Sequence, residues 1–300
     1  MKEKLIAATY APMNEDGTLN TECIINYKGF LIKNGVAGVF MNGSTGDFVS
    51  LTIEERKKIT SAWSKCKSEE LYLIDHVGSP SLKVAKELAA HASDKVDAIA
   101  AIAPYYFRLS SVEKLIEYCK EVASAAPNLP FYYYHIPVLS GANLNMEEFL
   151  IKATNEIPTL AGIKFTDNNL IAYSQSKNVN DKKFEIFFGF DELFINSLPV
   201  GASSWVGSTY NHLAPLYLRI IELFKNGDME AAADLQRKAI QFVEYLDSKG
   251  RFNGVAKGFM KTLGIDCGPS RFPHATLNDN DYIEINKHLE TLGISEWLSK

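Results

Sequence analysis

Eight short apolar runs alternate with helix-like segments over the first three quarters of the 300-residue chain, and this alternation limits the fold more than any other feature. The runs are 5–11, 35–42, 71–77, 96–103, 130–136, 160–166, 184–190 and 202–208. Strands that are apolar on both faces are typical of a parallel sheet covered by helices. A doubly wound open sheet shares this alternation, but eight strands close a (β/α)8 TIM barrel, so the count favours the barrel.

The strand-like runs stop after residue 226, and three further helical patterns begin near residues 228, 252 and 279. We therefore expect a barrel over 1–226 that carries the active site, and a C-terminal three-helix extension over 227–300 packed on it. Helix starts are marked by Ser or Thr ahead of acidic residues, as after Ser50 and Ser110.

Composition and charge limit the partners that the chain can have. Its 46% hydrophobic and 22% charged residues are typical of a globular protein with a substantial core. The net charge is −5 without a cluster of Lys and Arg, which argues against nucleic acid. The cysteines are scattered, no signal-peptide pattern is present, and the long uncharged stretch 194–218 is broken by Pro and Gly. These features predict a soluble cytoplasmic protein without a membrane partner.

Lys164 is a charged residue inside an apolar run, flanked by Ile163 and Phe165. One interpretation is that the strand ends near Thr166 and that the long stem carries the ammonium group to water. The other is that the amine lies at the carboxyl end of the sixth strand, where barrel chemistry collects. An amine in a poorly hydrated pocket is neutral more often and therefore nucleophilic toward a carbonyl, which would begin Schiff-base chemistry.

The fifth run contains three consecutive tyrosines, residues 132–134, followed by His135. Because strand side chains alternate between faces, at least one tyrosine points into the barrel and at least one points out. A tyrosine hydroxyl next to the sixth strand could relay protons for an imine, whereas the alternative is an aromatic core with hydrated hydroxyls. We expect His135, which alternates with Tyr134, to face the helices.

The segment NGSTGD, residues 42–47, follows the second run. Gly43 and Gly46 permit backbone conformations that aim successive N–H groups at one point, and Ser44 and Thr45 add hydroxyl donors. The segment is therefore a candidate cradle for a carboxylate or a phosphate, although glycine and serine also form ordinary turns.

Acidic residues follow the seventh run in GFDE, residues 189–192. Asp191 and Glu192 could bind sugar hydroxyls, or they could begin the next helix at its positive end. A glycosidase would need two opposed carboxylates near the mouth, and the spacing leaves Asp75 paired with Asp191 or Glu192 open. The six histidines have no metal-binding spacing, so we expect no metal site.

The segments GSTGD, PYYF, YYYHIP, GIKFT, GFDE and GSTYN together resemble the N-acetylneuraminate lyase branch of the dihydrodipicolinate synthase and lyase superfamily. The resemblance extends over nearly the whole chain, with the segments in order. It implies a β/α barrel with a helical extension, usually a homotetramer, that cleaves N-acetylneuraminate to N-acetylmannosamine and pyruvate through a Schiff base. It also implies small-molecule substrates and no metal or organic cofactor, because the lysine imine serves as the electron sink.

By this resemblance Lys164 forms the Schiff base, Tyr134 relays the proton and Tyr106 reaches across a subunit interface. Ser44 and Thr45 hold the carboxylate of the pyruvate moiety. The positions that match contacts to the hydroxyls and glycerol tail of a sialic acid are Thr166, Gly189, Asp191, Glu192 and Ser208, and Phe252 lines the same pocket.

Two positions bear on related activities. Dihydrodipicolinate synthases typically carry an arginine two residues after the proline of strand five, where it binds a second carboxylate, and here that residue is Leu139. The family's loop usually reads GSTGE, whereas here the acid is Asp47. An aldolase of the 2-keto-3-deoxygluconate type stays an alternative. A barrel that only binds a sugar acid is a further one, against which the presence of both Lys164 and Tyr134 argues.

Overall fold

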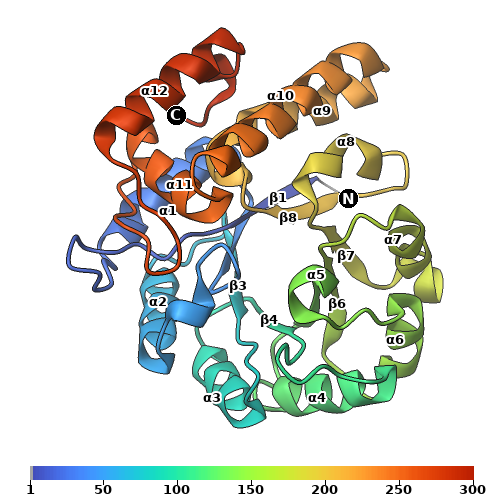
Figure 1. Ribbon diagram of the computed structural model, residues 1–300. Helices are drawn as coiled ribbons and strands as arrows, with labels where there is room; N and C mark the ends of the chain where they lie inside the picture. Colours follow the sequence, from blue (N-terminus) through green and yellow to red (C-terminus); the bar gives the residue numbers. More distant parts are fainter. Residues whose placement is uncertain (1–2) are drawn as a thin grey trace.

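The computed structural model describes residues 3–300, apart from the side chain of Lys182. Eight parallel strands follow one another around a closed barrel, and β8 pairs with β1 (Figure 1). The strands are β1 (Lys4–Ala8), β2 (Gly38–Met41), β3 (Tyr72–His76), β4 (Ala98–Ile102), β5 (Phe131–His135), β6 (Leu160–Phe165), β7 (Glu185–Phe188) and β8 (Ser204–Gly207). The predicted (β/α)8 barrel is confirmed, and every strand lies in its predicted run except that β1 begins one residue earlier.

Helices surround the strands in Figure 1 and connect each strand to the next. They are α1 (Cys23–Lys33), α2 (Ile53–Lys65), α3 (Leu82–Ala92), α4 (Val112–Ser124), α5 (Pro137–Ser140), α6 (Met146–Ala153), α7 (Leu170–Lys177), α8 (Phe194–Ser197) and α9 (Tyr210–Lys225). Short 3₁₀ helices are η1 (Phe48–Ser50), η2 (Val179–Lys182), η3 (Asp191–Leu193), η4 (Met260–Leu263) and η5 (Ser295–Trp297). Two helix starts match the predicted signals, since Thr52 caps α2 in a capping box with Glu55 and Ser111 caps α4.

Three α-helices follow the barrel, as the sequence predicts: α10 (Met229–Ser248), α11 (Phe252–Phe259) and α12 (Asp279–Thr291). In Figure 1 they lie together on one side of the molecule, and α10 packs along α9. The proposed division at residue 226 stays a prediction. Within residues 3–300 no helix combines the length and the apolar composition that a membrane crossing requires.

Side-chain alternation along the strands separates two apolar cores. One fills the barrel and includes Ile74, Tyr132 and Tyr134. The other lies between the barrel and the helices and includes Leu73 and Tyr133. The tyrosines of β5 therefore point in, out and in, as the two-residue period predicts, and His135 faces the helix layer, where its ring lies 5.0 Å from that of Phe165.

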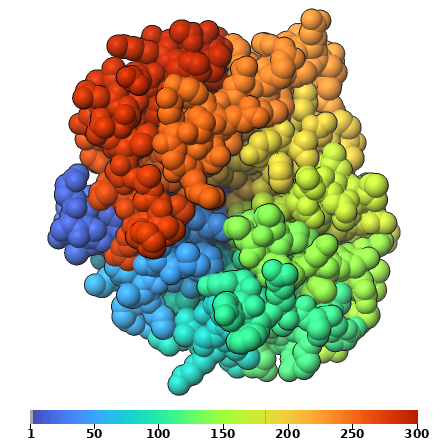
Figure 2. Space-filling model, in the orientation of Figure 1, coloured from blue at the N-terminus to red at the C-terminus, as the bar shows by residue number. Residues whose placement is uncertain are grey.

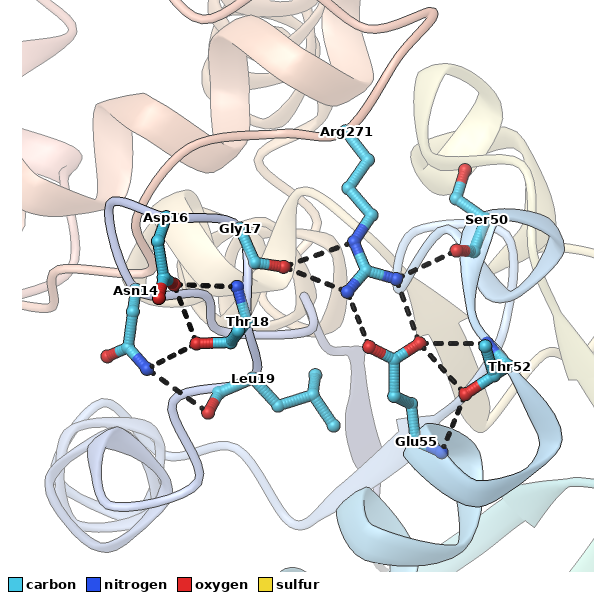
Figure 3. Close-up of polar contacts among 9 residues, drawn as sticks. All are labelled: Asn14, Asp16, Gly17, Thr18, Leu19, Ser50, Thr52, Glu55 and Arg271. Carbon is cyan, nitrogen blue, oxygen red and sulfur yellow. Dashed lines mark hydrogen bonds and ion pairs between the residues drawn. The ribbon is translucent and has the colours of Figure 1, made fainter.

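Arg271 links three chain segments that are far apart in sequence (Figure 3). Its guanidinium donates to the carbonyl of Gly17 at 2.8 Å and to that of Ser50 at 2.9 Å. It also pairs through two hydrogen bonds with the carboxylate of Glu55, which accepts from Thr52 in the capping box. The loop that follows η4 is therefore held against the start of α2.

Arg271→Met should lower the free energy of unfolding by roughly 1–3 kcal/mol, because it removes the donor to Glu55 and to two backbone carbonyls. The hydrogen bond from Arg271 is the main cause that lowers the pKa of Glu55 from 4.5 to about 2. The ion pair therefore stabilises the fold above pH 4.5, and its contribution disappears as the pH falls toward 2. The stability difference between variant and parent, measured by urea unfolding, should shrink over that window.

Arg237→Met is the matched control, since Arg237 pairs with Asp234 on an exposed face of α10. Its expected effect is less than about 0.5 kcal/mol. Equal losses in the two variants, or a difference for Arg271→Met that does not change with pH, would contradict this role of Arg271.

Candidate active site

A cavity of about 490 Å³ lies at the carboxyl ends of the barrel strands. The predicted site residues that line it are Ser44, Thr45, Tyr134, Lys164, Thr166, Gly189, Asp191, Glu192, Ser208 and Phe252. These residues come from five strand ends or the loops that follow them, and from the C-terminal extension. Of the predicted set only Tyr106 lies elsewhere among the described residues.

Lys164 and Tyr134 lie side by side, because they are register partners on the neighbouring strands β6 and β5. The lysine is 4% exposed, and its Nζ lies 4.0 Å from the centroid of the Tyr134 ring and 4.2 Å from that of Phe40. Aromatic faces of this kind attract an ammonium group. Within the part of the chain that the structure describes, Nζ has no hydrogen bond or ion pair. The amine thus lies in the cavity, and the interpretation that its stem carries it out to water is wrong.

The hydroxyl of Tyr134 points to the cradle segment, where it lies 3.4 Å from the Ser44 Oγ. The backbone of that segment differs from the expectation. Its left-handed residues are Asn42 and Asp47, with φ of 55° and 50°, rather than the two glycines. The two glycines fit a close approach instead, since a Cβ at 43 would lie 2.8 Å from the Phe40 ring and one at 46 would lie 3.1 Å from the carbonyl oxygen of Thr9.

The cradle leaves donors facing the cavity. Ser44 and Thr45 line it with their side chains, and among residues 3–300 their peptide N–H groups donate to no protein acceptor. The carbonyls of Gly43 and Ser44, by contrast, accept from Phe48 and Asp47 within the turn. Two hydroxyls and two free N–H groups at one place can bind a carboxylate.

Asp191 and Glu192 form the opposite, acidic wall. The Oδ2 atom of Asp191 accepts from the backbone N–H and the hydroxyl of Thr209, at 3.1 and 2.7 Å, while Oδ1 has no partner among the described residues. Burial raises the pKa of Asp191. Burial and the neighbouring charge of Asp191 raise the pKa of Glu192. Asp191 is also the first residue of η3, as the second interpretation of this residue expects, whereas its binding of sugar hydroxyls stays a prediction.

The C-terminal extension completes this wall. Gln236 of α10 donates from Nε2 to the carbonyls of Asp191 and Glu192, both at 3.2 Å. Sequence reasoning missed three lining residues of the same helix, which are Val243, Glu244 and Asp247. Their spacing places them on one helix face. Nothing in the sequence distinguishes that face from one that lies in water.

A second cavity of about 520 Å³ adjoins the first and shares Ser44 and Thr45 with it. Leu139, Asp47 and His274 line it. In Figure 2 the C-terminal segments, in orange and red, meet the blue and green barrel segments around a central hollow. Tyr106 is 80% exposed on the loop after β4 and lines neither cavity.

The glycosidase alternative required Asp75 as a carboxylate at the mouth, and the structure contradicts that placement. Asp75 alternates with the inward-pointing Ile74, so it faces the helices and lines neither cavity. Its carboxylate accepts from the side chains of Asn42 and Thr60 at 2.8 and 2.7 Å. In the described part of the chain, no group of three or more His, Cys, Asp or Glu side chains is arranged to hold a metal ion.

Taken with the closed barrel, the lysine-containing cavity places the chain among the (β/α)8-barrel enzymes that work at the carboxyl ends of their strands. The chain belongs to the dihydrodipicolinate synthetase family, whose model matches residues 1–292.

Within this family, the chain is similar to proteins named as N-acetylneuraminate lyases or sialic acid aldolases. The N-acetylneuraminate lyase of Rattus norvegicus is 39% identical over 274 residues, which cover 90% of this chain and 86% of that protein. The structure of the Proteus mirabilis N-acetylneuraminate lyase has a TM-score of 0.91 and 37% identity, and the match covers 97% of this chain and 99% of that one. A catalytic lysine mutant of the Ruminococcus gnavus sialic acid aldolase has a TM-score of 0.91 and 28% identity, with 99% of both chains covered. The resemblance found in the sequence is thereby confirmed, as is the assignment to the lyases.

Proposed function

We propose that this protein is a Schiff-base aldolase that cleaves N-acetylneuraminate to N-acetylmannosamine and pyruvate. The observation that carries the proposal is the buried amine of Lys164 beside Tyr134, opposite the Ser44 and Thr45 donors. An amine, a phenol and a carboxylate cradle are the groups that a 2-keto acid needs for imine chemistry. The relatives named above favour this activity over that of a dihydrodipicolinate synthase. They also favour it over the alternative of a barrel that binds a sugar acid without catalysis.

The proposed reaction begins when the Lys164 amine attacks the C2 ketone of the open-chain sugar acid. Loss of water from the carbinolamine gives a protonated imine, which is the electron sink. Tyr134, which has given its proton to the hydroxyl that leaves the carbinolamine as water, takes the proton from the C4 hydroxyl through the substrate carboxylate, and the C3–C4 bond electrons flow into the imine. N-Acetylmannosamine leaves, the enamine is protonated at C3, and water releases pyruvate. No step uses a metal or an organic cofactor.

The two cavity walls support the choice of substrate. The carboxylate of the pyruvate moiety would bind Ser44 and Thr45, and the remaining sugar hydroxyls would lie against Thr166, Asp191, Glu192 and Ser208 around Gly189, with Phe252 at the edge. A second carboxylate at this wall would be repelled by the acids. In the adjoining cavity it would meet Leu139, which cannot supply the cation that a desolvated carboxylate needs.

The assembly and the compartment are parts of the same proposal. Tyr106 and Phe107 are 80% and 84% exposed, and such neighbouring aromatics are typical of an interface. We infer a homotetramer in which Tyr106 reaches the adjoining cavity of a second copy, near the shared Ser44 and Thr45. The four free cysteines fit the reducing cytosol that we propose as its compartment.

Pyruvate with borohydride should leave a stable reduced adduct on Lys164 and abolish activity, because an imine is reducible in this way. Peptide mass mapping locates the adduct. Lys164→Ala should lose the adduct and several orders of magnitude in rate, and Lys164→Arg should be equally inactive because its guanidinium stays protonated. Lys257 is the matched amine, since burial lowers its pKa to about 8 and its Nζ donates to the carbonyl of Pro269. Lys257→Arg should keep the adduct, and a label on Lys257 instead of Lys164 would refute the mechanism.

N-Acetylneuraminate should give a higher kcat/KM than 2-keto-3-deoxygluconate or than pyruvate with aspartate semialdehyde. The acidic wall offers partners to hydroxyls and repels a second carboxylate. The three reactions are measured side by side on one preparation. If either of the other two reactions is more efficient, the proposed substrate is wrong, even if trapping at Lys164 supports the Schiff-base mechanism.

Tyr106→Ala and Lys164→Ala should each be nearly inactive alone but should regain activity when the two variants are co-expressed as mixed oligomers. A mixed pair contains one complete site, in which the Lys164 of one copy receives the Tyr106 of the other. Phe107→Ala, with the neighbouring exposed ring removed, is the control for loss of assembly. Full activity of Tyr106→Ala alone, or no recovery in mixed oligomers of normal size, would show that Tyr106 does not cross the interface.

A further inference from the structure

The cradle begins at a residue that the barrel holds in an unusual conformation. Asn42 is 3% exposed and has a φ of 55°, in the left-handed region, which asparagine tolerates better than most residues. Its side-chain amide donates to the Asp75 carboxylate at 2.8 Å, to the Thr60 hydroxyl at 3.1 Å and to the carbonyl of Arg56 at 3.2 Å. These bonds anchor the side chain of Asn42 to α2 and β3, but they leave the peptide that leads into Gly43 to be held by another group.

That group is His76, at the end of β3. Its Nδ1 lies 2.8 Å from the carbonyl oxygen of Asn42, and its Nε2 lies 3.2 Å from the peptide nitrogen of Ile102. A carbonyl only accepts and a peptide N–H only donates, so Nδ1 carries the proton and Nε2 the lone pair. Burial, together with the charge of Arg56, lowers the pKa of His76 well below its ordinary value. The imidazole is therefore neutral and held in one tautomer.

The same ring contacts the proposed proton relay. It meets the Tyr134 ring edge to face, with centroids 5.8 Å apart and an angle of 88°, and the Phe48 ring at 4.7 Å. Arg56 is buried behind it and donates to the carbonyls of His76 and Gly78. His76 thus lies between the first peptide of the cradle and Tyr134, and it belongs to neither cavity lining.

We propose that His76 is a positioning residue for the substrate carboxylate: its Nδ1–H bond to the Asn42 carbonyl sets the orientation of the cradle and thereby of the Ser44 and Thr45 donors. The inference rests on the proposed function, because it needs a carboxylate at the cradle. The inference adds a residue that lines neither cavity to those that carboxylate binding requires. Loss of the bond weakens binding of a 2-keto acid more than it slows the chemical step, since Lys164 and Tyr134 stay on their strands.

Two substitutions distinguish the hydrogen bond at Nδ1 of His76 from the one at Nε2. In His76→Asn the side-chain amide nitrogen can take the place of Nδ1 and keep the donation to the Asn42 carbonyl. In His76→Gln the longer side chain can reach the place of Nε2 and keep the acceptor for Ile102, but it leaves the Asn42 carbonyl without a donor. Both variants lose the same aromatic contacts, so a merely structural role of the ring predicts similar defects in the two.

The measurement is the pyruvate concentration that gives half-maximal borohydride trapping at Lys164, together with kcat, KM and the thermal midpoint. His76→Gln should raise the half-saturating pyruvate concentration about tenfold or more, the usual effect of one buried hydrogen bond that is lost without replacement. His76→Asn should stay within about threefold of the parent, with a similar fall in thermal midpoint. Trapping of hydroxyacetone, a ketone without a carboxylate, should be alike in both variants.

Equal defects in the two variants, an unchanged half-saturation in His76→Gln, or an equal loss with hydroxyacetone would overturn the role assigned to His76 while the Schiff base stands. Absence of any trapping at Lys164 in the parent protein would overturn the proposed function and this inference together.

Discussion

The pairing of β5 with β6 is the constraint on which the site depends. It sets Tyr134 opposite Lys164, so the two side chains share one face of the sheet, and that face is the interior of the closed barrel. The interior supplies aromatic faces, from Phe40 and Tyr134, around an amine that is almost out of contact with water. A slip of one residue in this register would turn Lys164 toward the helix layer and bring Phe165 to the mouth. The chemistry proposed here is therefore a consequence of strand register before it is a consequence of residue type.

The C-terminal extension is part of the site as well as of the chain's outer layer. Gln236 holds the backbone of the acidic wall, and Asp247 accepts from the N–H of Phe252 at 2.9 Å, which fixes the start of α11 at the cavity edge. Arg271 fastens the loop after η4 to the start of α2, and in the same loop His274 lies 3.7 Å from Asp47. A boundary near residue 226 would describe the order of the elements, but the cavity uses residues from both sides of it.

The parts of this site that could be predicted are those governed by local periodicity. The apolar runs determined the eight strands, and the two-residue period required at least one of the three tyrosines to point inward and placed His135 on the face opposite Tyr134. The same period places Asp75 toward the helices when Ile74 points into the barrel. Asp75 was wrongly considered as a carboxylate at the mouth because only its position in the sequence was used, and not the alternation of side chains along β3. Val243, Glu244 and Asp247 could not be found in this way, because their place at the cavity depends on how α10 packs on α9, a contact without a local signal. The left-handed conformation of Asn42 and Asp47 was not predicted, because glycine adopts positive φ most readily and each of these residues has a glycine next to it.

The buried polar atoms are paired to different degrees at the cradle and at the cavity wall. At the cradle, Asn42, Thr60, Asp75 and His76 exchange hydrogen bonds over short distances, and of these side chains only Asn42 has a buried atom, Oδ1, without a partner among the described residues. At the cavity, the hydroxyl of Thr166 and the Oδ1 of Asp191 are buried without a partner among the described residues. A buried polar atom left unpaired costs about 1–3 kcal/mol, so the fold keeps these two side chains at the cavity wall at a cost in stability. Both oxygens pack on glycines, since a Cβ at Gly189 would lie 2.3 Å from the Thr166 hydroxyl oxygen and one at Gly207 would lie 1.9 Å from the Oδ1 of Asp191. The acidic wall therefore depends on Gly189 and Gly207 as much as on the polar side chains that they accommodate.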